Sequence, residues 1–65
     1  MEEFIKMLED SLSEEMSDVA KYEKLANWAD EHELYGVETI LLDISKEEKT
    51  HAKHIKEIIR DLKDE

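Results

Sequence analysis

A stripe of apolar residues, repeating at alternating steps of four and three, runs through the second half of the chain. This spacing places every member on one face of an α-helix. The middle of the stripe is broken by Glu48 and His51, and a matching stripe in the first half is broken once, by Glu15. The stripes comprise Ile5, Leu8, Leu12, Glu15, Val19, Tyr22, Ala26 and Ala29, then Val37, Leu41, Ile44, Glu48, His51, Ile55, Ile58 and Leu62.

These three ionisable residues stand where a helical bundle has its core. An unpaired carboxylate in such a place costs several kcal/mol, because it has lost its water. The pattern therefore predicts that the carboxylates are neutralised by a partner side chain, by protonation or by a bound cation.

The spacing predicts an all-α fold, an antiparallel two-helix hairpin that forms one domain over residues 1–65. No proline and only one glycine interrupt the chain, so we expect helices over about residues 2–30 and 34 or 35–63, joined by a turn at 31–33. A hairpin this small covers one side of each helix only. We therefore expect two hairpins to dimerise into a ferritin-like four-helix bundle.

Antiparallel geometry predicts that the three ionisable residues meet. A turn centred near His32 places Glu15 level with Lys49, which lies between Glu48 and His51. At the usual rise per residue the helices are roughly 40 Å long, so this height is about halfway along them.

Composition narrows the chemistry of any site. The chain has no cysteine, so metal ligands must come from Glu, Asp and His, which suits a hard or borderline ion. A net charge of −10 argues against nucleic acid and anionic membrane surfaces as partners, and no segment reaches the length of a membrane span. We expect a soluble, cytoplasmic protein that handles cations.

A metal site across a dimer follows from the ligand count. A Glu-x-x-His pair places both side chains on one face of a helix, so one hairpin offers Glu15, Glu48 and His51. Two hairpins related by a two-fold axis offer four Glu and two His, which is the ligand set of di-iron and di-manganese carboxylate bundles. This predicts two metal ions per homodimer.

A metal-free helical interaction module is the alternative from a different class. In that reading Glu15 and His51 form a buried hydrogen bond and Glu48 turns to the rim, but four carboxylates then meet at the dimer centre without a counter-charge.

Other residues have lesser predicted roles. Tyr22, Asp18 and Glu47 are candidate neighbours of the ligands, Met16, Leu25 and Trp28 are expected to pack against a further helix, and His32 and His54 are expected at the surface.

The chain from about Leu8 to Ile59 resembles the ferritin-like superfamily, and most closely one half of a rubrerythrin-type four-helix domain. The resemblance is carried by Glu15, Tyr22, residues 26–29 and the run Glu47-Glu48-Lys49-Thr50-His51-Ala52, which is similar to the family's Glu-x-x-His-Ala motif. It implies that Glu15 is a terminal ligand, Glu48 a bridging ligand and His51 a terminal nitrogen ligand of iron.

The resemblance also implies a function. It favours a ferroxidase-type oxidoreductase that oxidises Fe(II) with O2 or peroxide, with manganese as the alternative metal and a rubrerythrin-like peroxide reductase as the alternative activity. Encapsulated ferritins are similar half-size proteins that build their iron site across a dimer, although no targeting tail for an encapsulin shell is visible after Leu62. The chain also lacks a rubredoxin-like cysteine cluster, so an electron-transfer partner would be a separate protein.

Overall fold

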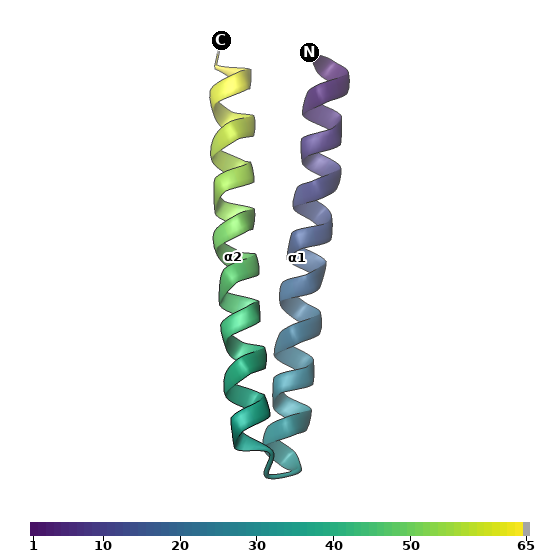
Figure 1. The fold of residues 1–65 in the computed structure, drawn as a ribbon. Coiled ribbons are helices and arrows are strands. Elements are labelled where there is room, and N and C mark those ends of the chain that lie inside the picture. The colour runs from purple at the N-terminus through teal and green to yellow at the C-terminus, as the bar shows by residue number, and fades with distance from the viewer. Residues whose placement is uncertain (65) are drawn as a thin grey trace.

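Two long antiparallel helices make up the protein in a computed structural model that describes residues 1–64 (Figure 1). Helix α1 spans Glu2–Glu31 and helix α2 spans Tyr35–Lys63. The hairpin measures 49 × 14 × 10 Å, and its two ends lie side by side at the end opposite the turn. The predicted two-helix hairpin is confirmed, with each helix boundary within one residue of its expected place.

The turn is closed by backbone hydrogen bonds that satisfy the last carbonyls of α1. The N–H of Glu33 donates to the Asp30 carbonyl at 3.0 Å, and the N–H of Leu34 donates to the Ala29 carbonyl at 2.8 Å. Glu33 has a φ of 60°, the left-handed conformation that such a helix ending requires. The chain therefore reverses over residues 32–34 without leaving these α1 carbonyls unpaired.

Small side chains form the contact between the helices. Ala26 and Ala29 on α1 and Ala52 on α2 are buried, and Ser45 is buried with its hydroxyl donating to the Val19 carbonyl at 3.4 Å. Small residues at a crossing let two helices approach closely, because no long side chain separates the backbones.

The face that α2 turns to α1 is offset from the predicted apolar stripe by one residue. Its most buried residues are Ser45, Ala52 and Ile59, each one position after a member of the predicted stripe. The stripe residues Val37 and Ile58 remain 48% and 44% exposed. Periodicity identifies the apolar face of a helix, but this face is wide, and only part of it is used within the hairpin.

Much of the apolar surface therefore stays in contact with water. An exposed apolar surface of this extent usually marks a contact with another molecule. Its large members within residues 1–64 are Met1, Phe4, Met7, Met16, Leu25, Trp28, Leu34, Tyr35, Val37, Ile40, Leu42 and Ile58. No helix in this part of the chain is long and apolar enough to cross a membrane.

Replacing Gly36 by Ala should stabilise the hairpin by about 0.5 kcal/mol, because alanine loses less backbone entropy than glycine when a helix forms. Gly36 lies in the first turn of α2, and an added Cβ would meet no atom within 4 Å. Thermal unfolding of Gly36→Ala beside the wild type measures this, and a lower melting temperature for the variant would contradict it.

Candidate metal centre

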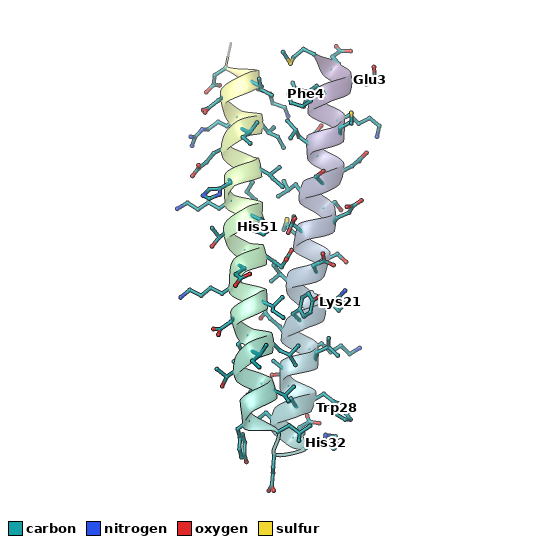
Figure 2. All side chains as sticks on the ribbon, viewed as in Figure 1. Glu3, Phe4, Lys21, Trp28, His32 and His51 are labelled. Carbon is teal, nitrogen blue, oxygen red and sulfur yellow. The ribbon has the colours of Figure 1, made fainter. Side chains whose placement is uncertain are left out.

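Glu15, Glu48 and His51 meet between the helices at mid-length. Glu15 lies near the middle of α1, and Glu48 and His51 lie near the middle of α2, one helical turn apart. Figure 2 shows His51 about halfway along α2. A spacing of three residues places both α2 side chains on one side of their helix, and the antiparallel register brings Glu15 level with them.

The three side chains are close enough to share one ion. One potential ligand atom from each residue can be chosen so that all three lie within 4.8 Å of one another. Atoms that bind the same ion at about 2.0–2.2 Å lie roughly 3 to 4.4 Å apart. The group therefore needs only a small contraction to enclose a metal.

Glu15 has an unsatisfied oxygen at this point. Its Oε2 atom is buried and has no hydrogen-bond partner among residues 1–64. The Nδ1 atom of His51 lies 3.6 Å away, which is too far for a good hydrogen bond. A buried carboxylate oxygen without a partner is unfavourable, so the geometry suits a cation between these groups. Two carboxylates and an imidazole are also donors that iron accepts.

The carboxyl group of Glu15 affects the ionisation of Glu48. Glu15 raises the pKa of Glu48, first because Glu48 can donate a hydrogen bond to the Glu15 carboxylate only when Glu48 is protonated. Partial removal from water and the negative charge of Glu15 act in the same direction, Asp18 adds to the effect, and His51 opposes it. Glu48 therefore releases its proton at a higher pH than an isolated glutamate side chain does.

The group is open on one side. Glu15 and Glu48 are half-buried, whereas the His51 side chain is 55% exposed. One hairpin thus contributes three ligand groups and leaves the rest of a coordination shell unfilled.

The three predicted neighbours of the site, Asp18, Glu47 and Tyr22, differ in burial and in their contacts. Asp18 is half-buried, forms a 3.7 Å ion pair with Lys21 and lies near enough to influence Glu48. Glu47 is exposed. Tyr22 is half-buried beneath the Lys21 ammonium, and within residues 1–64 its hydroxyl makes no hydrogen bond to the site. Of the three, Asp18 has the clearest link to the carboxyl pair.

The two remaining histidines lie away from the group. His54 is exposed, and His32 stacks on Trp28 at the turn, with ring centroids 3.8 Å apart.

Comparison with known families supports the reading of the residues. The rubrerythrin family model matches residues 6–65. The chain belongs to the rubrerythrin family. This confirms the resemblance drawn from the sequence, and rubrerythrin-family proteins typically bind iron. The match includes Glu15, Glu48 and His51. No curated protein matched the chain. No solved structure matched it either.

The raised pKa of Glu48 predicts a pH dependence for the metal-free protein. A carboxyl group with a higher pKa in the folded than in the unfolded chain stabilises the fold while protonated, and this contribution disappears as the pH rises through the folded-state value. The stability of the wild type relative to Glu48→Gln should therefore fall as the pH rises above about 4.3, the ordinary pKa of a glutamate side chain. Thermal melts of both proteins in chelator measure this difference, and parallel pH profiles would contradict it.

Proposed function

We propose that this rubrerythrin-family protein is a di-iron carboxylate protein that forms its metal site across a homodimer and oxidises Fe(II). The observation that carries the proposal is the group of Glu15, Glu48 and His51 at mid-length, with the buried Glu15 oxygen unpaired. The family match supports iron as the metal.

The dimer follows from the incomplete ligand set. Two copies of the group supply four Glu and two His, enough ligands for two ions. A two-fold axis at the height of the group brings both halves together and aligns the two hairpins over their full length, because the group lies at the middle of each helix. The same contact covers apolar residues that one hairpin leaves exposed, such as Val37 and Ile58.

The ligand charges suit iron in this reaction. By family resemblance, Glu15 and Glu48 would hold the iron through carboxylate oxygens and His51 would hold it through a ring nitrogen. Four carboxylates balance the charge of two divalent ions and stabilise the trivalent product, while the neutral imidazoles add ligands without adding charge. Bound iron supplies the redox chemistry, and the chain supplies placement and electrostatics.

The overall reaction balances with two Fe(II) as substrate. Each Fe(II) loses one electron, and O2 takes up these two electrons and two protons to give hydrogen peroxide. If peroxide is the oxidant, two electrons and two protons break its O–O bond and give two waters. Any proton on Glu48 leaves when cations bind, because carboxylates must be deprotonated to act as ligands.

Replacing Glu48 or His51 by Ala should abolish Fe(II) oxidation while the helices remain. Removing a group that merely supports a metal ligand weakens metal binding by roughly 10- to 100-fold, so losing a ligand should slow oxidation by about 100-fold or more. Stopped-flow absorbance after mixing Fe(II) protein with O2 measures the rate, with circular dichroism as the check on folding. Asp43→Ala, which removes an exposed carboxylate elsewhere on α2, is the matched control. A Glu48→Ala protein with wild-type oxidation would contradict the proposal.

Glu48→Ala should also make the metal-free protein more stable. In the metal-free state the substitution relieves the repulsion among clustered carboxyl groups. A satisfied polar network in a metal-free interaction module would lose stability on the same change, since a partner would be left unpaired. The sign of the change in melting temperature in chelator separates the two functions, and a clearly destabilised variant would favour the module.

Peroxide reduction is the second candidate, because the family match accommodates it equally. In that activity the iron cycles between two oxidation states and does not accumulate. Steady consumption of peroxide with an added reductant, without growth of ferric mineral, would favour it over Fe(II) oxidation. Metal analysis of the purified protein distinguishes iron from manganese.

A further inference from the structure

A basic stripe runs along α2 on the side away from the candidate metal centre. It contains six of the nine Lys and Arg residues of the chain, spaced alternately by three and four positions. In a protein with a net charge of −10, this is a local positive surface. Its members are Lys46, Lys49, Lys53, Lys56, Arg60 and Lys63.

Two members of the stripe pair with carboxylates of α1, and a gap lies between these two pairs. Glu9 pairs with Lys63 at 3.7 Å, and Glu23 pairs with Lys49 at 3.7 Å. These pairs are fourteen residues apart on each helix, and the residues midway between them are Met16 and Lys56. Midway between Glu9 and Glu23, α1 therefore has an apolar side chain and no carboxylate. Within residues 1–64, Lys56 has no carboxylate within ion-pair distance.

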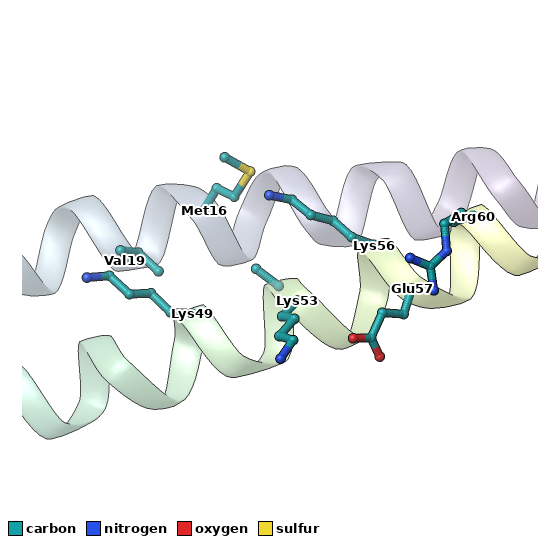
Figure 3. A pocket seen from close by; sticks show the side chains of 8 residues that line it. Met16, Val19, Lys49, Lys53, Lys56, Glu57 and Arg60 are labelled. Carbon is teal, nitrogen blue, oxygen red and sulfur yellow. The ribbon is translucent and has the colours of Figure 1, made fainter.

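A groove opens at this gap (Figure 3). Its volume is about 740 Å³, its floor is formed by Met16, Val19 and Ala52, and its rim carries Lys49, Lys53, Lys56 and Arg60, with Glu57 as the one carboxylate. Lys49 and Lys56 extend from α2 toward α1, whereas Lys53 points away from it. We call this feature the outer groove. Met16, Lys49 and Ala52 each directly follow a member of the Glu15, Glu48 and His51 group, so the groove lies across the helix contact from that group.

The complementary surface is present on α1 of the same chain. Glu3, Met7, Asp10 and Glu14 follow one another at steps of four, three and four, which places them on one face, and all four are exposed. Asp10 and Glu14 also line a polar hollow with Ser13, Ser17 and Asp18, and Asp10 forms an exposed 3.8 Å ion pair with Lys6. In this set, an exposed methionine is flanked by carboxylates, whereas the outer groove has an apolar floor flanked by cations, so the two surfaces are complementary in charge and in apolar contact. We call these four residues the acidic strip.

The two helices also differ in overall charge. Helix α1 carries ten acidic and three basic residues, whereas α2 carries six of each. Because α2 is neutral overall, copies arranged with α1 beside α2 meet less repulsion than copies arranged with α1 beside α1, and charges act mainly within the screening length of about 8 Å at physiological salt. The negative charge of the whole chain therefore does not prevent this contact.

We propose that the outer groove is a docking site for the acidic strip of a second copy. The contact joins two different surfaces, so each copy can offer its acidic strip to one neighbour and its outer groove to another. The association therefore extends into a ring or a row. Neither surface includes Glu15, Glu48 or His51, and the contact does not depend on metal. The proposal is therefore independent of the proposed function, and the repeating unit can be one hairpin or the metal-binding dimer.

Charge reversal on each surface tests the contact. Lys53→Glu with Lys56→Glu reverses the outer groove, and Asp10→Lys with Glu14→Lys reverses the acidic strip. Lys21→Glu with Lys24→Glu is the matched control, because it changes the net charge as much as the groove variant does and lies on neither surface. Sedimentation velocity of each protein, and of an equimolar mixture of the two surface variants, measures association. Circular dichroism checks folding.

The wild type and the control should form particles larger than the repeating unit at low salt, with the mean mass rising about twofold or more. Each surface variant alone should stop at the repeating unit, and the mixture should restore association, because the reversed groove of one variant fits the reversed strip of the other. Salt of roughly 0.5 M, which shortens the screening length to about 4 Å, should dissociate the wild type. A wild type that never exceeds the repeating unit, or a mixture that fails to associate, would overturn the proposal. Association of the separate variants would do the same.

Discussion

The proximity of Glu15 and Glu48 is the constraint on which the account of this protein depends. A single hairpin of two helices has little interior, yet it places two carboxyl groups and His51 within reach of one another at its middle. Glu15 raises the pKa of Glu48, and within residues 1–64 the Glu15 Oε2 atom has no hydrogen-bond partner. Both features are unfavourable for a purely structural protein. They are expected of a site that is prepared for cations.

The two sides of the helix contact have different chemistry. On one side, the carboxyl groups and His51 are accompanied by half-exposed Val37 and Ile58. On the other, exposed ion pairs and the basic rim surround the small apolar floor of the outer groove. Exposed ion pairs contribute little stability. The difference therefore supports a division of roles, in which the first side completes a metal site with a partner hairpin and the second associates by charge.

The sequence predicts the helices, the turn and the meeting of the three ionisable residues, because each follows from periodicity and from antiparallel register. It does not predict that Ser45, Ala52 and Ile59 carry the contact with α1, since this depends on how α2 is rotated about its axis. Residue spacing does not predict the Glu15 oxygen without a partner among residues 1–64 either, because this feature depends on how the side chains are placed. Asp18 stands out from Glu47 and Tyr22 only once distances are known. The outer groove lies where α1 has Met16, midway between Glu9 and Glu23, which both pair with lysines of α2. The sequence alone does not show that Met16 and Lys56 line the same groove.

Native mass spectrometry of protein loaded with Fe(II) without oxygen tests the central claim most directly, because it reports chain number and metal number in the same particle. The account predicts that iron is found only in particles with an even number of chains, with two ions for every two chains, and that Glu48→Ala removes them. A folded monomer that holds iron by itself, or a dimer that holds none at saturating Fe(II), would contradict it.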